Sequence, residues 1–229
     1  MDKLKHIKVY EGNKEGFLFD ELPEEIQDKI IDRESESLRN DPDMVREDDW
    51  APDVLDEFET RMEDMGWENL EMRYSGFYSQ GDGASFTGIL SDGEKKTVFV
   101  KEILGMDKFP QQIIDRITFK VVGLNSRYYH ENTVKLEIDD EGYDPYDYES
   151  EEIEIQSFLD LVVKVNVETM LNKLLPVAST WVKNTCIKLY DDLENAYEKY
   201  IDHISGREGI IDYFREEKTL FNSEGNEIL

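Results

Sequence analysis

Residues 74–88 read YSGFYSQGDGASFTG, and this stretch predicts a β-hairpin. Aromatic and small residues alternate ahead of residues 81–83 (GDG), which are residue types that tight turns favour. A second turn signal of the same kind lies at residues 91–93 (SDG). We therefore expect an antiparallel meander, interrupted by a short helix at about 110–116. The segments expected to form its strands are 70–77, 84–90, 95–102, 117–122 and 133–138.

Helical patterns lie on both sides of this strand block. Before it, Trp50, Val54 and Phe58 show the spacing of three and four that is typical of an amphipathic helix. Asp20 is a suitable cap for an earlier helix, and Pro23 suits its first turn. The expected helices are 20–38, 49–65, 153–175, 177–203 and 207–217. Short extended segments are expected at 6–10, at 17–19 and after 219.

The order of these elements predicts an α+β fold, in which an antiparallel sheet meander is covered by N-terminal and C-terminal helices. No internal repeat or flexible linker interrupts the chain, so we expect one compact domain over residues 1–229. Its parts are an acidic helical pair at 20–66, a strand block at 69–138, an acidic loop at 139–154 and a helical block at 155–217.

Charge is the unusual property of this sequence. Its 54 acidic residues outnumber 26 basic ones and give a net charge of −28, while 39% hydrophobic and 11% aromatic residues supply a packed interior. Residues 11–68 hold 22 acids against 6 bases, and residues 139–154 hold no base. Such a chain is repelled by nucleic-acid backbones and anionic lipid, which argues against direct nucleic-acid or membrane binding. Basic proteins remain as partners.

The sequence offers little for a metal or redox centre. One cysteine, Cys186, excludes an internal disulfide framework and suggests a buried core position, and three histidines leave few ligands. We expect no cofactor and no metal. The first residues do not resemble a signal peptide, and uncharged runs are far shorter than the roughly 20 residues that span a bilayer. These observations predict a cytoplasmic protein.

Three segments are candidate sites of chemistry. Residues 74–88 lack the lysine and the following helix of a phosphate-binding loop, which favours a structural hairpin with Gln80, Asp82 and Ser85 bonding turn backbone. Residues 139–144 align poorly with a calcium-binding loop, because Tyr148 falls where a bidentate glutamate is required. His130 has no second histidine or serine nucleophile nearby, so a hydrogen-bonded structural role is favoured. No catalytic residue is predicted.

The excess of acidic residues invites a functional explanation, although a merely solvated surface is equally compatible with it. Self-repulsion destabilises a compact domain, and solubility needs far less charge. Carboxylates along a helix and a loop can imitate phosphates and compete for the basic groove of a nucleic-acid-binding protein. Tyrosines in the loop can anchor such an interface. The predicted partner-binding residues are Asp41, Asp43, Glu47, Asp48, Asp49, Asp56, Glu59 and Glu63 in the first acidic face, and Asp139, Asp140, Glu141, Tyr143, Asp144, Tyr146, Asp147, Tyr148 and Glu149 in the second.

Four segments together resemble a family of small acidic proteins of bacteriophages and prophages. These are residues 19–27, the central YSGFYSQGDGASFTG, the YYHEN of residues 128–132 and the LYDDLENAYE of residues 189–198. The resemblance extends to the LFNSEG of residues 220–225 and covers most of the chain. Members are mostly uncharacterised and some are labelled antitoxins. The resemblance therefore implies a phage setting and no catalytic residues, and the acidic insert at 139–154 departs from shorter members.

Three functions follow from these observations. The first is a phage-encoded, non-enzymatic inhibitor of a basic, nucleic-acid-handling defence protein or ribonucleoprotein complex of the host, such as a CRISPR effector. The second is an antitoxin that neutralises a basic toxin of the same mobile element. The third is a phosphate-handling enzyme with Gln80, Asp82 and His130 at its site. The apolar helix at 153–175 also leaves a homodimer possible.

Overall fold

The computed structural model describes residues 16–40, 45–77, 79–124, 126–140 and 153–228. Its packing groups the chain into two compact units, where the sequence predicted one domain. Unit 1 comprises residues 1–52 and 195–229, and unit 2 comprises residues 53–194. No glycine-rich or proline-rich linker marks the division, because its second boundary falls inside the long helix α5 (Ile153–Ile204). Each unit is described by itself below.

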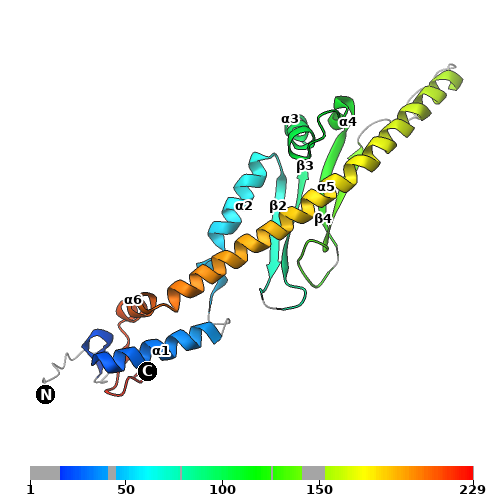
Figure 1. Cartoon of the computed structure of the whole chain (residues 1–229). Coiled ribbons are helices and arrows are strands. Elements are labelled where there is room, and N and C mark those ends of the chain that lie inside the picture. Colours follow the sequence, from blue (N-terminus) through cyan, green and yellow to red (C-terminus); the bar gives the residue numbers. More distant parts are fainter. Residues whose placement is uncertain (1–15, 41–44, 78, 125, 141–152, 229) are drawn as a thin grey trace. The chain divides into compact units, whose positions relative to one another are not determined.

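Unit 2 is built on a four-stranded antiparallel sheet in the order β2-β3-β4-β5 (Figure 1). Four of the five predicted strands form this meander, and with the flanking helices they confirm the α+β class. Gly81 and Asp82 lie in the turn between the first two strands, as the sequence predicted, and Gly83 begins the second strand, where it pairs with Ser75. The strands are β2 (Glu68–Ser75), β3 (Gly83–Leu90), β4 (Ile117–Gly123) and β5 (Val134–Asp140).

The strand predicted at 95–102 is wrong, because this segment forms α3 (Gly93–Val98) and a π-helical turn, η4 (Phe99–Ile103). Asp92 caps the helix, since its side chain accepts a hydrogen bond from the backbone N–H of Lys95 at 2.8 Å. The predicted second hairpin turn is therefore a helix start. The short helix predicted at about 110–116 is confirmed as α4 (Gln111–Arg116).

One face of the sheet is covered by an aromatic core. Trp67, which is 1% exposed, stacks on Trp181 of α5 with ring centroids 5.9 Å apart and an interplanar angle of 7°. Phe86 of β3 and Phe99 meet the edge of the same indole at 5.9 and 5.7 Å. The α2 helix (Pro52–Asp64) adds Phe58, whose ring lies 5.6 Å from Phe86. Such aromatic pairs contribute beyond the area that they bury.

The two helices predicted at 153–175 and 177–203 are one helix, α5, which continues through Pro176. A proline inside a helix removes one backbone hydrogen bond and usually bends or ends the helix. Here Leu174 and Ala178, on either side of it, are fully buried. Thr180 also donates from its hydroxyl to the Pro176 carbonyl oxygen at 2.8 Å. Tertiary packing thus outweighs the local signal.

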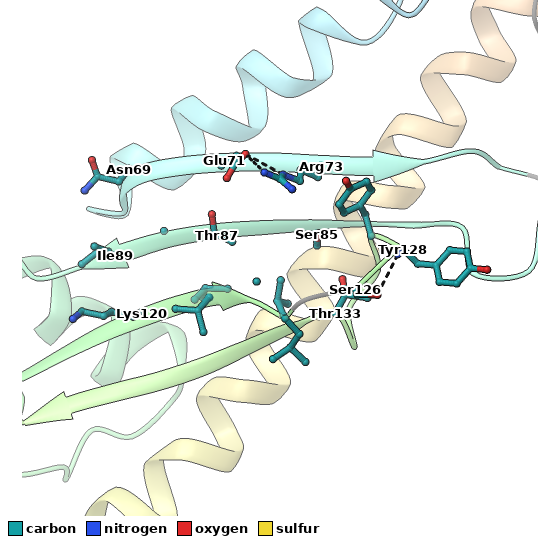
Figure 2. Close-up of a pocket in the computed structure, with 17 residues that line it drawn as sticks. Asn69, Glu71, Arg73, Ser85, Thr87, Ile89, Lys120, Ser126, Tyr128 and Thr133 are labelled. Carbon is teal, nitrogen blue, oxygen red and sulfur yellow. Dashed lines mark hydrogen bonds and ion pairs between the residues drawn. The ribbon is translucent and has the colours of Figure 1, made fainter.

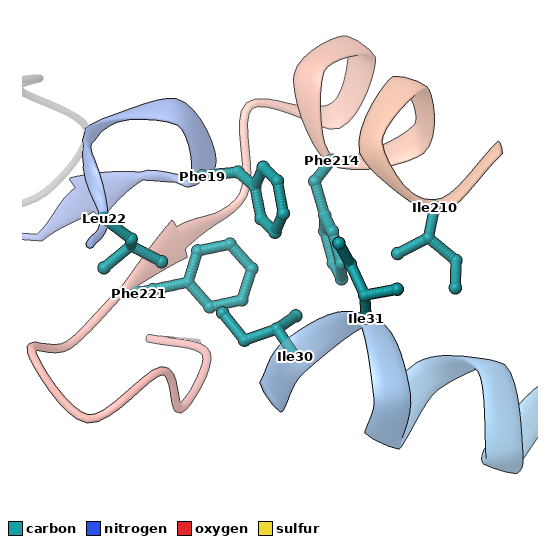
Figure 3. Close-up of a cluster of buried hydrophobic side chains, with 7 residues drawn as sticks. All are labelled: Phe19, Leu22, Ile30, Ile31, Ile210, Phe214 and Phe221. Atoms are coloured by element: carbon teal, nitrogen blue, oxygen red, sulfur yellow. The ribbon is translucent and has the colours of Figure 1, made fainter. Parts of the chain in front are cut away.

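Unit 1 is a small helical layer closed by a two-stranded ribbon. Phe19 stacks on Phe214 at 5.5 Å, and Phe214 meets the edge of Phe221 at 5.0 Å (Figure 3). Leu22, Ile30, Ile31 and Ile210 complete this buried cluster. The elements are β1 (Phe17–Leu18), the 3-10 turn η1 (Phe19–Glu21), α1 (Glu24–Asn40), the 3-10 turn η3 (Glu47–Asp49), α6 (Arg207–Glu217) and β6 (Leu220–Phe221).

Two predictions near the ends of unit 1 have different outcomes. The edge strand predicted after residue 219 is confirmed as β6, which pairs antiparallel with β1. Asp20 is not a helix cap, because it lies in η1 and its carboxylate pairs with Arg215 at 2.9 Å. The extended segment predicted at 6–10 lies outside the described residues.

Candidate functional site

The residues predicted for the first acidic face do not form one surface within either unit. Glu47, Asp48 and Asp49 form η3 in unit 1, whereas the other described members lie on α2 in unit 2. Asp49 is also engaged, because it accepts a hydrogen bond from Tyr200. Burial, together with the charge of Asp49, raises the pKa of Tyr200. Asp41 and Asp43 lie outside the described residues.

Helix α2 gathers carboxylates on the side opposite its buried side chains. Phe58 and Met62 are 2% and 1% exposed and face the core of unit 2. The helical period places an acidic residue on the outer side in every turn except the one at Thr60. We call the five exposed acids of this side the α2 stripe: Asp53, Asp56, Glu57, Glu63 and Asp64.

The sequence selected Asp56, Glu59 and Glu63 on this helix, and the structure changes that set. Glu59 is only half-exposed, at the border of the stripe. Asp53, Glu57 and Asp64 are exposed members outside the predicted set. Counting three, four, seven and eleven residues onward from Asp53 would have found Asp56, Glu57, Thr60 and Asp64 on one side.

The carboxylates of the α2 stripe have no basic partner among the described residues. Among the residues that the structure describes, none makes an ion pair or a side-chain hydrogen bond with a stripe carboxylate. The one basic residue of α2, Arg61, instead lies over the ring of Phe58 at 5.2 Å. A surface depression borders the stripe and is lined by Asp56, Glu57, Thr60, Arg61, Asp64 and Met65. The stripe therefore presents, beside a concave surface, negative charge that no described basic residue pairs with.

Elsewhere, many acids are paired. Asp139 and Asp140, predicted within an exposed acidic loop, instead end strand β5. Asp139 pairs with Lys120, and Asp140 pairs with Arg116 at 3.0 Å. Extended strand pairing with β4 brings these acids to bases that the sequence separates from them by about twenty residues. The remaining members of the second face, Glu141, Tyr143, Asp144, Tyr146, Asp147, Tyr148 and Glu149, lie outside the described residues.

A second concave surface lies on the face of the sheet that carries no aromatic core. The cavity measures about 600 Å³ and is lined by alternate residues of the strands, such as Ser85, Thr87 and Lys120, and by the segment around Tyr128 (Figure 2). Arg73 of β2 donates to Glu71 at 2.5 Å, and this hydrogen bond and charge raise the pKa of Arg73. We call this surface the sheet pocket.

His130 and Cys186 have structural surroundings. The backbone N–H of His130 donates to the Thr133 hydroxyl at 3.0 Å, and the Nδ1 of His130 accepts from the Asn132 N–H at 3.2 Å. Cys186 is fully buried, which confirms its predicted core position, and burial raises the pKa of its thiol to about 11. A thiol of that pKa is a poor nucleophile near neutral pH. Asp82 accepts from the Ser79 N–H, as predicted for a turn residue.

The described part of the chain contains neither a cluster of metal-binding side chains nor a membrane-spanning helix. No three His, Cys, Asp or Glu side chains within it lie close enough to hold a metal ion. No helix within it combines the length and the hydropathy that crossing a membrane requires.

Residues 50–202 match a family described as a domain of unknown function (DUF8835). The matched segment contains all of unit 2, and with it both the α2 stripe and the sheet pocket. Comparisons with curated proteins and with solved structures find no match. Because the matched segment makes up more than half of the chain, this protein belongs to the DUF8835 family.

Proposed function

We propose that this chain is a phage-encoded, non-enzymatic inhibitor, which binds a basic, nucleic-acid-handling protein of the bacterial host through the α2 stripe. The observation that carries the proposal is that these exposed carboxylates have no basic partner among the described residues, whereas Asp139 and Asp140 do. The phage setting and the host cytoplasm as its location rest on the sequence resemblance given above.

The proposed mechanism is competition for cationic side chains. Successive turns of a helix rise by about 5.4 Å, so the α2 stripe presents carboxylates in a row along one line. Lysine and arginine side chains that hold guide or target strands would meet these carboxylates in place of phosphates. The net charge of −28 would steer such a partner toward the chain and make association fast and sensitive to salt.

The α2 stripe lowers the stability of its own helix, which supports a role in binding. Like charges four residues apart, such as Asp53 and Glu57, destabilise a helix by about 0.2–0.5 kcal/mol. Glu63 and Asp64 in the last turn also face the negative end of the helix dipole. A solvated surface has no need of acids at these positions.

The test compares two variants of the full chain that each remove four negative charges. The stripe variant is Asp56→Asn, Glu57→Gln, Glu63→Gln and Asp64→Asn. The matched control neutralises exposed glutamates of unit 1, which also have no ion pair among the described residues: Glu198→Gln, Glu208→Gln, Glu216→Gln and Glu217→Gln.

Each immobilised variant is exposed to host lysate at low and at high salt. We expect the wild type to retain a basic nucleic-acid-handling protein at low salt. In a second assay with that purified protein, the wild type should displace labelled DNA or RNA from it. The stripe variant should bind it roughly tenfold more weakly or worse, and the control within about twofold. Equal losses in both variants, or a partner without a basic nucleic-acid site, would contradict the proposal. Capture of a basic toxin from the same mobile element would assign the antitoxin role instead.

A further inference from the structure

The four-stranded sheet of unit 2 has two edges that differ in regularity. Along the edge strand β2, the pairing with β3 shifts between Glu68 and Glu71, and Asn69 has a φ of 54°. Such a bulge makes an edge a poor template for a further strand. The opposite edge strand, β5, pairs with β4 over all 7 of its residues without a shift, and it contains neither proline nor glycine. The β5 edge is therefore a regular template for another strand.

The hydrogen-bond pattern of β5 shows which of its backbone groups face this edge. Leu124 donates from its backbone N–H to the Thr133 carbonyl oxygen at 2.7 Å, immediately before β5 begins. Hydrogen-bonded pairs recur at every second residue of an antiparallel ladder. The odd-numbered residues of β5 therefore direct their N–H and C=O groups to β4, whereas Val134, Leu136 and Ile138 direct theirs to the edge. None of the described residues bonds to these outward groups, which suit the backbone of an added strand.

The charges of β5 favour a second copy of the same strand in one register. Lys135 and Glu137 have side chains that are 61% and 41% exposed, and they lie 3.2 Å apart on one face of the strand. In an antiparallel pairing of two copies centred on Leu136, Lys135 of each copy lies opposite Glu137 of the other. A shift of one step in either direction places Lys135 opposite Lys135, or Glu137 opposite Glu137. Opposite charges across a strand pair stabilise it and like charges destabilise it.

The apolar face of β5 suits the same register. Val134 and Leu136 are 8% and 4% exposed, whereas Ile138 is only half-buried. With the pairing centred on Leu136, Ile138 of each copy lies opposite Val134 of the other, which covers its exposed part. A two-fold axis perpendicular to the sheet relates the two copies and keeps this face on the same side in both.

We propose that the β5 edge binds a second copy of this chain, in an antiparallel pair of β5 strands centred on Leu136. The sheets of the two copies then form one continuous sheet. The pairing goes beyond the proposed function, because it does not depend on the α2 stripe. The net charge of −28 opposes the approach of two copies, so the dimer forms best where salt screens that repulsion.

Sedimentation equilibrium of the full chain tests for the dimer. The measurement covers about 10 µM to about 500 µM protein in about 0.5 M salt, where the screening length is only a few ångströms. We expect a dissociation constant on the order of 100 µM, since a short strand edge makes a small and transient interface. A wild type that remains monomeric throughout this range overturns the proposal.

Two charge reversals test the register. Lys135→Glu and Glu137→Lys each place like charges opposite one another across the whole pair, and each should weaken self-association at least about tenfold. An equimolar mixture of these two variants restores opposite charges at every position, so it should form a heterodimer within about threefold of the wild-type affinity. The control Lys188→Glu makes the same charge change on an exposed site of α5 and should stay within about twofold. Unaltered unfolding midpoints verify that the variants fold.

Hydrogen exchange locates the interface. The amides of Val134, Leu136 and Ile138 should become more protected as the protein concentration rises, because only the dimer gives them a partner. The proposal is overturned if protection rises in α5 instead of at these amides. It is also overturned if Lys135→Glu dimerises like the wild type, or if the mixture of the two variants stays monomeric.

Discussion

Unit 1 and helix α2 of unit 2 are both rich in acidic residues, but they use them differently. In unit 1, some acids bind arginines of distant segments, as Asp28 binds Arg207 at 2.7 Å and Asp20 binds Arg215 at 2.9 Å, while others, such as Glu198 and Glu217, have no ion pair among the described residues. On α2 the stripe carboxylates have no such partner within the described residues. Acids that join segments serve the fold, whereas acids that only repel one another reduce its stability. The unpaired set is therefore the better candidate for binding another molecule.

The substitution with the largest expected effect tests whether the two units, which pack separately, also unfold independently. Phe214→Ala removes the ring that stacks on Phe19 and meets Phe221, so it should cost about 3–5 kcal/mol. We expect hydrogen exchange to accelerate in α1 and α6, with little change in β2 to β5.

The control for this experiment is Phe214→Leu, which keeps most of the buried volume and should accelerate exchange much less. If exchange in the sheet of unit 2 rose as much as in α1, the chain would unfold as one cooperative domain. That outcome would support the single domain that the sequence predicted, because the two units would then share one free energy of unfolding.

A smaller effect concerns the buried thiol of unit 2. Burial raises the pKa of Cys186 to about 11 from an ordinary value of 9.0. Above pH 9 the unfolded chain loses this proton while the folded chain keeps it, so the free energy of unfolding falls as the pH rises from about 9 to 11. The two pH units correspond to roughly 2–3 kcal/mol. Urea unfolding at several pH values measures this loss.

Cys186→Ala serves as the reference, because it lacks the thiol but shares every other group that titrates in this range. Its stability is lower at all pH values, owing to the cavity, but should fall less steeply between pH 9 and 11. Parallel curves for the two proteins would show that Cys186 is accessible to solvent and would contradict the tight packing of α5 against the sheet.

The sequence predicted the parts of the fold where local pattern and tertiary packing agree. The GDG turn, the strands around it and helix α6 appear as expected, because turn chemistry and periodicity are local properties. Residues 95–102 were misassigned, since the apolar run at Val98, Phe99 and Val100 suits a strand as well as a buried helix. The cap by Asp92 decides between them.

The sequence alone did not show which acidic and basic side chains form ion pairs. Asp139 and Asp140 belong to an acidic run in the sequence, and only the register of β4 against β5 brings Lys120 near. The α2 stripe was found in part, because its helix was predicted but its exposed side was not separated from its border at Glu59. The sequence does not reveal the sheet pocket, because its lining comes from three strands and the segment around Tyr128, which meet only in the fold.

The smallest expected effect is the sharpest test of the comparison, since the same substitution should act with opposite sign at two sites of unit 2. Asp140→Asn weakens the ion pair with Arg116 and should lower the free energy of unfolding by up to about 1 kcal/mol. Asp64→Asn removes a negative charge from the last turn of α2 and should raise it by about 0.3–1 kcal/mol. Each variant removes one charge and keeps the shape of the side chain, so their difference isolates pairing from net charge. Urea unfolding at low salt measures both, and high salt should bring both values closer to the wild type. If Asp64→Asn instead lost as much stability as Asp140→Asn, the carboxylates of α2 would stabilise the fold. Their presence would then need no binding partner to explain it.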